Sequence, residues 1–408
     1  MKISQSLFSV LVVMALIAGL FVPAGTTGQS VYIPDSLKYL GQSPPDSIPV
    51  RFPPDDLLAN ADWFWHGPVT FSPDLEEMYW GENIVLDHKG DIFYMMYDNG
   101  QWLGPYQTYF TMDDYSYNNP FFGTSHDTLW FQSSKPGGFI SYVTWQSYYW
   151  SDPVQLSLQI PSGKSRGLQF SMSGTGDIYA ELDEDKMDIN IYRWKKVNGS
   201  YLFPEKLDST INSPEYDFCP FIDPYEQYMV FSSTRPGGYG GFDLYLSNHN
   251  QDGTWSVPIN LGSTINTEAD EWAPSITPDG LYLFFLSHRG DDLGYNPYWV
   301  SANVVYQLVT GVSETGNQIT NLPFILYQNT PNPFSTETSI KYSLLQSGFV
   351  TMTIYSAMGV PIKTVVNQLM PKGTHEISFD AGTLPAGIYI CSLRVDYAVR
   401  TRIMVILK

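Results

Sequence analysis

Hydrophobic and polar positions alternate along this chain in short stretches rich in aromatic residues, and long helical periodicity is absent outside the N-terminus. The clearest example is Phe231–Tyr245, where an aromatic stretch enters a turn with two Gly-Gly pairs and a second alternating stretch leaves it. Glycine accepts the positive φ angles of a tight or bulged hairpin. This stretch predicts two antiparallel strands joined by a glycine-rich turn, and the overall pattern predicts an all-β protein.

Weaker copies of this pattern recur at a nearly constant interval. They begin at residues 68, 120, 168, 220 and 274, which are 52, 48, 52 and 54 residues apart. Each copy predicts three antiparallel strands, and four copies add a fourth strand containing a proline, at residues 105, 153, 204 and 258. Proline is tolerated on an edge strand. Four antiparallel strands per repeat are typical of a propeller blade, so residues 49–305 are predicted to form a five-bladed β-propeller. A six-bladed propeller stays open, because residues 31–47 are unassigned.

The fifth copy lacks a fourth strand of its own, because the chain leaves it at Val304–Val305. Upstream of the first copy, Pro49–Phe52 has the pattern of an isolated fourth strand. Pro49 precedes Pro68 by 19 residues, and the other fourth-strand prolines precede the next copy by 15 or 16. We therefore expect this N-terminal strand to complete the last blade, which leaves no unpaired sheet edge.

The N-terminus predicts export. Lys2 precedes an apolar run from Leu7 to Val22, followed by Pro23 and Ala24, so residues 1–24 are predicted to be a signal peptide and residues 25–48 an N-terminal extension. A membrane anchor is the alternative, but the run is short for a span and no basic residue follows it. No other stretch is long and apolar enough to cross a bilayer. The two cysteines, Cys219 and Cys391, are expected to be buried small hydrophobic residues without a disulfide between them.

Charge and composition change near residue 321. Residues 322–408 carry seven Lys/Arg and four Asp/Glu, whereas the rest of the chain carries 14 against 37. The acidic part is not expected to bind nucleic acid or anionic lipid. Residues 306–321 are polar and predict a flexible linker, and residues 322–408 predict about seven short strands, which is typical of a small Ig-like β-sandwich.

Three segments of the repeats resemble a known propeller family. They are Phe71–Asp74 (F-S-P-D), Thr277–Gly280 (T-P-D-G) and Ser232–Asp243 (S-S-T-R-P-G-G-Y-G-G-F-D). They resemble the WD40-like propeller repeats of the TolB type, over roughly residues 35–305, and the third repeat departs most from the pattern. The resemblance implies an exported propeller. It does not specify a function, because such repeats serve many partners.

The C-terminal part resembles the type A sorting domain of the type IX secretion system. The resemblance rests on motif residues spread through the whole segment: Asn329, Pro331, Asn332, Pro333, Phe334, Gly359, Gly387, Tyr389 and the final Lys408. That family implies handling by the type IX machinery, transport across the outer membrane, and release or attachment at the cell surface. An ordinary Ig-like module is the alternative.

Motifs for catalysis, phosphate binding or metal binding are absent from the sequence. No zinc-protease, serine-hydrolase or phosphate-loop pattern occurs, and the six histidines show no paired ligand spacing. Asp91 and Asp243 open third strands, where aspartate usually accepts hydrogen bonds from turn amides. We therefore expect neither a cofactor nor a metal.

One set of residues remains as a candidate site. In a four-stranded blade, the residues before the inner strand lie at the same end as the turn between the second and third strands, and that end is the mouth of the propeller. The predicted ring at the mouth contains Trp65, His66, Tyr117, Asn118, Ser165, Arg166, Asp217, Phe218, Glu271 and Trp272. Aromatic rings beside carboxylates and an arginine suit a sugar or peptide ligand, although the same rings would also simply plug the mouth.

Two functions are compatible with this ring. The first is a non-catalytic binding or scaffold module at the cell surface for a glycan or a protein, which the repeat type favours. The alternative is a five-bladed glycoside hydrolase that uses Asp217 and Glu271 as its paired carboxylates.

Overall fold

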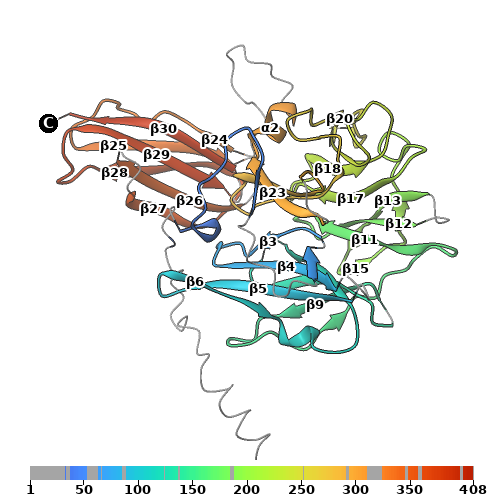
Figure 1. Ribbon diagram of the computed structural model, residues 1–408. Helices are drawn as coiled ribbons and strands as arrows, with labels where there is room; N and C mark the ends of the chain where they lie inside the picture. Colours follow the sequence, from blue (N-terminus) through green and yellow to red (C-terminus); the bar gives the residue numbers. More distant parts are fainter. Residues whose placement is uncertain are drawn as a thin grey trace, which may run out of the picture. The chain divides into compact units, whose positions relative to one another are not determined.

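The computed structural model describes residues 33, 37–52, 63–65, 67–84, 89–123, 125–136, 138–183, 188–250, 252–290, 294–309, 324–344, 348–356, 361–395 and 398–407. These residues form antiparallel β-sheets with very little helix, which confirms the all-β prediction (Figure 1). The predicted signal peptide lies outside the described residues. The chain divides into two compact units, residues 1–275 with 284–299 and residues 276–283 with 300–408.

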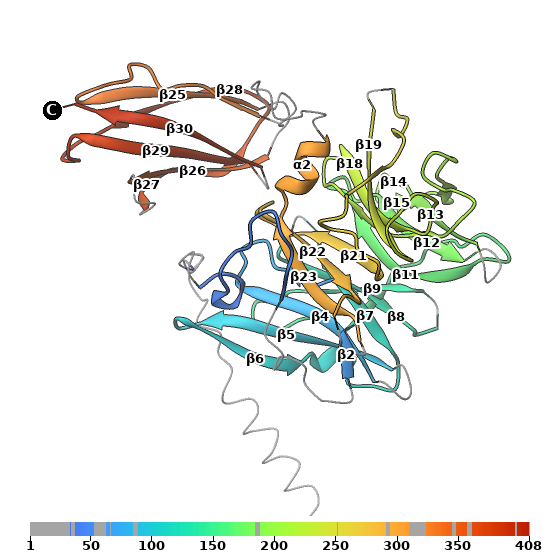
Figure 2. The ribbon, with the colours of Figure 1, turned by 45° about the horizontal axis from the view of Figure 1, so that its top comes forward.

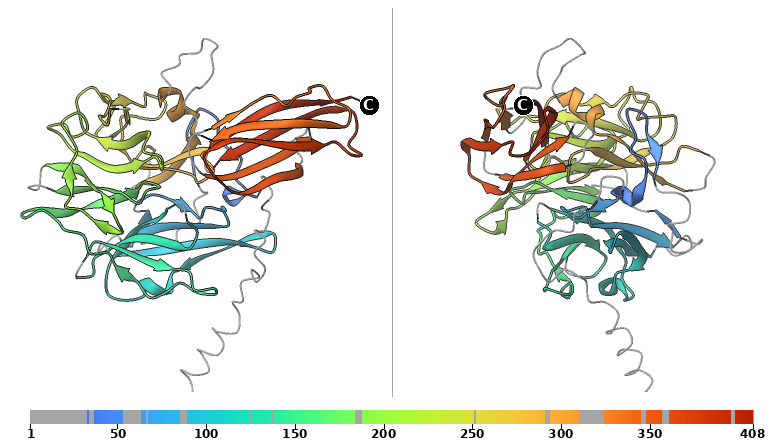
Figure 3. Two further views of the ribbon diagram at one scale, coloured as in Figure 1. Left: turned by 180° about the vertical axis from the view of Figure 1, so that it is seen from behind. Right: turned by 90° about the vertical axis from the view of Figure 1, so that its left-hand side faces the viewer.

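Five sheets follow one another between residues 50 and 301, and neighbouring sheets pack in chain order, as the blue-to-yellow sequence of colours shows (Figure 3). The first sheet contains β2 (Trp63–Trp65), β3 (Thr70–Phe71), β4 (Glu77–Ile84), β5 (Gly90–Asp98) and β6 (Gln101–Gln107). The second contains β7 (Tyr117–Phe122), β8 (Thr128–Ser133), β9 (Ile140–Thr144) and β10 (Val154–Gln155). The third contains β11 (Ser165–Met172), β12 (Ile178–Asp183), β13 (Ile189–Trp194) and β16 (Glu205–Lys206), with the hairpin β14 (Lys196–Val197) and β15 (Ser200–Tyr201) between the last two. The fourth contains β17 (Asp217–Ile222), β18 (Tyr228–Ser233), β19 (Asp243–Asn248) and β20 (Ile259–Asn260).

The fifth sheet is completed by the N-terminal strand, as the proline spacing predicts. It consists of β21 (Glu271–Ile276), β22 (Tyr282–Ser287), β23 (Asn296–Ser301) and β1 (Val50–Arg51), with Val50 opposite Trp299. The next residue, Phe52, is fully buried and its ring contacts Phe71, Phe284 and Trp299. Since Phe71 belongs to the first sheet, this packing joins the first and fifth sheets.

The repeat is also visible in the backbone of the inner strands. Asn119, Cys219 and Ala273 occupy the same position of the second, fourth and fifth inner strands and have φ angles of 51°, 51° and 54°. Gly67 occupies that position in the first sheet, with a φ of 88°. The pairing register shifts at this point in the second and fourth sheets, which defines a β-bulge. Four of the five sheets therefore share one local backbone geometry at this position despite their different sequences.

A short helix corrects the predicted linker. Helix α2 (Asn303–Val309) begins directly after β23 and occupies the first residues of the segment that was expected to be flexible. Its sequence is rich in β-branched valine, which disfavours helix, but Val305 is buried and the Tyr306 hydroxyl donates to the carbonyl of Gly280 at 2.9 Å. Tertiary contacts therefore override local propensity here. The 3₁₀ turns η1 (Tyr39–Gly41) and η2 (Tyr109–Thr111) are the other described helical segments.

Two facing sheets form the C-terminal part (Figure 2). One contains β24 (Phe324–Leu326), β25 (Glu337–Leu344) and β28 (Gly373–Asp380), and the other contains β26 (Gly348–Ser356), β27 (Pro361–Met370), β29 (Gly387–Val395) and β30 (Ala398–Ile406). Residues from both sheets share one hydrophobic core, which includes Phe334, Tyr389 and Cys391. Both cysteines of the chain are buried and free, as expected.

The first part of the sorting motif is held by its own side chains. The side-chain amide of Asn329 donates to the Thr338 hydroxyl at 2.9 Å. The side-chain oxygen Oδ1 of Asn332 accepts from the backbone N–H of Val405 at 2.7 Å. Phe334 is buried, and its backbone pairs with β30. These contacts fix the segment before β25 against the last strand. Two further motif residues, Gly359 and Lys408, lie outside the described residues.

Candidate functional site

The residues before the inner strands lie beside the turns that join the second and third strands. The Thr234 amide donates to the Tyr216 carbonyl at 3.1 Å, and the His288 amide donates to the Asp270 carbonyl at 3.1 Å. The Ser134 amide makes the same bond to Ser116 at 2.9 Å. We call this end of the sheets the mouth end. The predicted candidate ring belongs to it.

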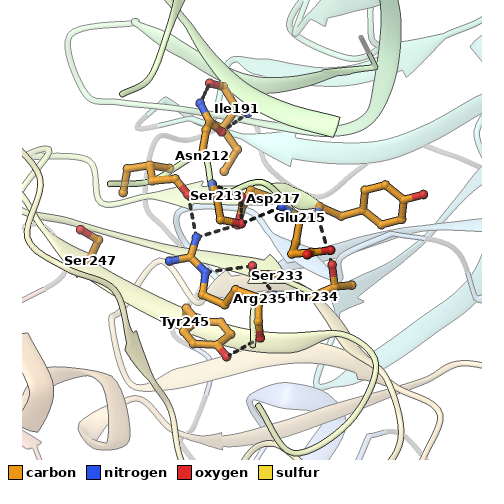
Figure 4. A network of polar contacts seen from close by, with 12 residues as sticks. Ile191, Asn212, Ser213, Glu215, Asp217, Ser233, Thr234, Arg235, Tyr245 and Ser247 are labelled. Carbon is orange, nitrogen blue, oxygen red and sulfur yellow. Dashed lines mark hydrogen bonds and ion pairs between the residues drawn. The ribbon is translucent and has the colours of Figure 1, made fainter. Parts of the chain in front are cut away.

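Asp217 is fully buried and takes part in a network inside the fourth sheet (Figure 4). One carboxylate oxygen accepts from the backbone and hydroxyl of Ser213, at 2.6 and 2.7 Å. The other accepts from the Arg235 guanidinium at 2.6 Å. Arg235 also donates to the Ile211 carbonyl at 2.6 Å, and its guanidinium lies 5.0 Å from the ring centroid of Phe231. Asp217 therefore joins the loop before the fourth inner strand to the glycine turn.

Glu271 makes an equivalent network 54 residues later. It is fully buried and accepts from the Thr267 backbone and hydroxyl, both at 2.7 Å, and from the Ser287 hydroxyl at 2.8 Å. Arg289 forms an ion pair with it at 3.2 Å and donates to the Ile265 carbonyl. We call these two networks the arginine latches. Hydrogen bonds between charged groups are among the strongest in proteins, so each arginine latch holds the loop before the inner strand against the turn of its own sheet.

The second sheet carries a variant of the latch in which tyrosine replaces the buried carboxylate. The Tyr117 hydroxyl donates to Asp113 at 2.9 Å, and Lys135 forms an ion pair with Asp113 at 2.8 Å. Burial raises the pKa of Tyr117 to about 12, and the hydrogen bond to Asp113 adds to the increase. Burial acts to raise the pKa of Asp113, but the hydrogen bonds from Lys135, the Tyr115 backbone and Tyr117 together outweigh it, and the pKa is lowered. Asp113 and Lys135 are missing from the predicted ring.

The predicted ring is largely buried. Trp65 is 4% exposed and lies against Trp80, Tyr117 is 0% exposed, and Trp272 is 6% exposed. With Asp217 and Glu271, these side chains form what we call the mouth floor. His66 and the side chain of Arg166 lie outside the described residues. The burial of these aromatic rings agrees with the simpler of the two interpretations, in which the rings fill the mouth end and do not contact a ligand.

The glycine turn of the fourth sheet packs directly against the loop before the fifth inner strand. A Cβ atom on Gly240 would lie 2.1 Å from the Ala269 carbonyl oxygen, and one on Gly241 would lie 2.3 Å from the Asp270 carboxylate. The Asp243 carboxylate accepts from the amides of Tyr239 and Gly240, at 2.6 and 3.2 Å, as expected for a turn aspartate. Glycine is required here because two backbones meet.

An accessible aromatic group lies next to this turn and was missed by the sequence analysis. Tyr295 is half-buried, its ring lies 5.1 Å from Trp272 and 4.5 Å from the exposed His288, and its hydroxyl donates to Asp270 at 3.2 Å. Burial raises the pKa of Tyr295 to about 12, and the charge of Asp270 adds to it. Asp270 also accepts from the Phe242 amide at 3.1 Å, which ties the group to the glycine turn. We call Asp270, His288 and Tyr295 the mouth shelf. The sequence signal was the place of His288 and Tyr295 on either side of the last second-to-third-strand turn, with Asp270 directly before the inner strand of the same sheet.

Metal binding finds no support in the described part of the chain, where no group of three or more His, Cys, Asp or Glu side chains could hold an ion. Among the described residues, no helix is both long and apolar enough to span a membrane.

Residues 330–407 match the family of secretion system C-terminal sorting domains. The protein is therefore exported through the type IX system, to the cell surface or the medium. No curated protein matches the chain in sequence.

Several solved structures are similar at low identity. A prolyl endopeptidase matches with 10% identity and a TM-score of 0.35, over 82% of this chain and 54% of that one. The Bacteroides ovatus xyloglucan-locus protein GH43B matches with 11% identity and a TM-score of 0.39, over 87% and 91%. PorZ, a surface component of the type IX system of Porphyromonas gingivalis, matches with 12% identity and a TM-score of 0.29, over 82% and 50%. The chain thus spans about half the length of the endopeptidase and of PorZ. At these scores the similarities carry no argument about function.

Proposed function

We propose that the five sheets are the blades of one closed propeller of the WD40-like, TolB type, followed from residue 322 by a type A sorting domain with an Ig-like sandwich. Contacts between sheets support closure. The Ser275 hydroxyl of the fifth sheet donates to the Val69 carbonyl beside the first at 3.0 Å, and β1 pairs with β23. A closed propeller leaves only short, protected strand edges, and this limits edge-to-edge aggregation.

We further propose that this propeller is a non-catalytic binding module for a glycan or a protein at the cell surface. The observation that carries the proposal is the state of the mouth carboxylates. Asp217 and Glu271 are both fully buried, and each is paired with an arginine of its own sheet. A glycoside hydrolase needs one carboxyl group that can give up a proton and a second that can reach the sugar. Two latched carboxylates satisfy neither condition.

Because the mouth floor is buried, we propose that a ligand at the mouth end contacts the accessible residues of the mouth shelf and the neighbouring glycine turn. The mouth shelf presents a tyrosine ring, an imidazole and a carboxylate within one group, and Tyr239 on the neighbouring glycine turn is 49% exposed. Aromatic faces stack on apolar faces of a ligand, and the carboxylate and imidazole fix its polar groups. The glycine turn is held beside the mouth shelf, because Gly240 and Gly241 fit closely against Ala269 and Asp270.

The test is a binding and turnover screen of the full mature chain against a panel of polysaccharides and surface proteins. We expect binding without release of reducing ends, and we expect His288→Ala with Tyr239→Ala to weaken binding at least tenfold while the melting temperature is unchanged. Glu268→Gln, an exposed residue of the neighbouring loop, is the control and should bind normally. Unchanged binding by the double variant would remove the mouth shelf from the account.

A further inference from the structure

Two adjacent tyrosines are displayed at the tip of a turn in the second sheet. Tyr148 and Tyr149 lie between β9 and β10 and are each 59% exposed. Turn tips usually carry Gly, Asn, Asp, Pro or Ser, for reasons of backbone geometry and solvation. In an antiparallel sheet the β9–β10 connection is at the opposite end from the β8–β9 turn, so this tip is not part of the mouth end. The mouth shelf therefore does not account for it.

The turn that carries these tyrosines is held firmly on both sides. Trp145 and Trp150 pair across it as a β-bridge, and their rings make an edge contact at 5.2 Å. Trp150 is 6% exposed and its indole N–H donates to the Tyr79 hydroxyl of the first sheet at 3.1 Å. The Gln146 amide donates to the Tyr149 carbonyl at 2.8 Å, which closes the turn. The fold thus uses the two tryptophans as its anchors and leaves the two tyrosine rings in solvent.

Backbone strain at the tip points the same way. Ser147 has a φ of 70°, in the left-handed region that glycine occupies without cost. A non-glycine residue is disfavoured there, because its Cβ approaches the backbone carbonyl. Such strain persists where surrounding contacts over-determine the conformation, and it concentrates at binding sites. The strained residue directly precedes the two exposed rings.

A third exposed ring and a carboxylate belong to the same surface. Tyr109, next to β6, is 50% exposed, and its hydroxyl donates to the carbonyl of Trp150. Asp152 follows Trp150 by two residues, and burial together with the charges of Asp152 and Tyr149 raises the pKa of Tyr109. We call Tyr109, Tyr148 and Tyr149 the tyrosine rim. It combines three aromatic faces, their hydroxyls and the exposed carboxylate of Asp152.

We propose that the tyrosine rim is a second binding surface, and that its ligand is a neutral polysaccharide. The C–H faces of pyranose rings stack on exposed aromatic side chains, and sugar hydroxyls donate to a carboxylate such as Asp152. An anionic polymer is disfavoured, because residues 1–321 carry 14 basic against 37 acidic side chains. Exposed tyrosines are also enriched at protein interfaces, so a protein partner, a second copy of this chain included, is the competing outcome that the experiment must separate. With the mouth shelf at the other end of the sheets, the chain would hold two ligands independently.

The experiment is affinity electrophoresis of the full mature chain in gels that contain a β-glucan, an α-glucan or a galactomannan, with polygalacturonate as the anionic comparison. We expect retardation by at least one neutral polymer and none by polygalacturonate. Tyr148→Ala with Tyr149→Ala should raise the dissociation constant at least tenfold with an unchanged melting temperature, since both rings are exposed. Tyr148→Phe with Tyr149→Phe keeps the stacking faces and should retain most of the affinity.

Phe203→Ala is the matched control, because Phe203 is an equally exposed aromatic residue, 57% exposed, on the third sheet. It should bind like the wild type. Asp152→Asn should weaken binding severalfold. The proposal is overturned if the wild-type chain ignores every neutral polymer, or if the double alanine variant binds as tightly as the wild type. It is also overturned if sedimentation shows a dimer that the double variant dissociates. None of these outcomes depends on the mouth shelf, whose variants His288→Ala and Tyr239→Ala should leave retardation by the rim intact.

Discussion

Asp217→Asn tests whether a mouth carboxylate is structural. Asparagine keeps the shape of the side chain but removes the charge that compensates Arg235. In the wild type the carboxylate accepts from the Ser213 backbone at 2.6 Å, from the Ser213 hydroxyl at 2.7 Å and from Arg235 at 2.6 Å. The side-chain NH₂ group of asparagine would face one of these donors and could not accept from it. We therefore expect a large loss of stability and no gain of any activity.

The magnitude follows from burial. The side chain of Asp217 is 0% exposed and that of Arg235 is 13% exposed, so solvent screens the remaining charge poorly. Removing one partner of a buried ion pair costs about 3–5 kcal/mol. For a domain of this size, roughly 2 °C of melting temperature corresponds to each kcal/mol, which predicts a decrease of about 6–10 °C.

The assay is a thermal melt of the full mature chain, followed by far-UV circular dichroism. Glu215→Gln is the control, because Glu215 is exposed and lies two residues away. Combining Asp217→Asn with Arg235→Met removes both charges and should cost less than the two single changes added together. If Asp217→Asn melts within 2 °C of the wild type, the latch does not stabilise the fold and the carboxylate is free for another role.

Three further predictions concern other parts of the chain. A chain that begins after Phe52 should melt well below one that begins at Val31, because β23 then presents an unpaired edge; equal melting temperatures would refute closure by β1. Deletion of residues 322–408 should leave a folded protein in the periplasm of a host with a type IX system, and surface display of this truncated chain would contradict the sorting assignment. Burial raises the pKa of Asp223 to about 6 from its ordinary value of 3.8, so the folded state binds the extra proton and stability should fall as pH rises from about 4 to 6. Asp223→Asn should remove this decrease of about 3 kcal/mol, since its oxygen can still accept from the amides of Tyr225 and Gln227, and an unchanged pH profile of the melting temperature would refute the assignment.

Local rules in the sequence predicted much of the fold. The spacing of Pro49 from the first repeat identified a strand whose partner, β23, lies almost 250 residues away. The glycine turn at 236–241 and the turn role of Asp243 also followed from local backbone requirements. Helix α2 was not predicted, because packing of Val305 overrides the poor helix propensity of its valines.

The candidate site was predictable only in part. Chain connectivity placed the right residues at one end of the sheets, but it carried no information on their burial. Whether Asp217 faces a ligand or an arginine depends on a partner 18 residues away, across a turn. One signal was present: Ser233 and Arg235 recur 54 residues later as Ser287 and Arg289, in step with Asp217 and Glu271. A pattern of donor and acceptor that repeats with the fold indicates a structural role.

The central claim, that the mouth carboxylates hold the fold and catalyse nothing, is tested most directly by Glu271→Gln. The measurement is release of reducing ends from the polysaccharide panel, taken beside a thermal melt of the same samples. Our account predicts no release by either protein and a melting temperature about 6–10 °C lower for the variant, since Glu271 is 0% exposed and paired with Arg289. Release by the wild type that Glu271→Gln abolishes, with the melting temperature unchanged, would contradict the account and establish a hydrolase.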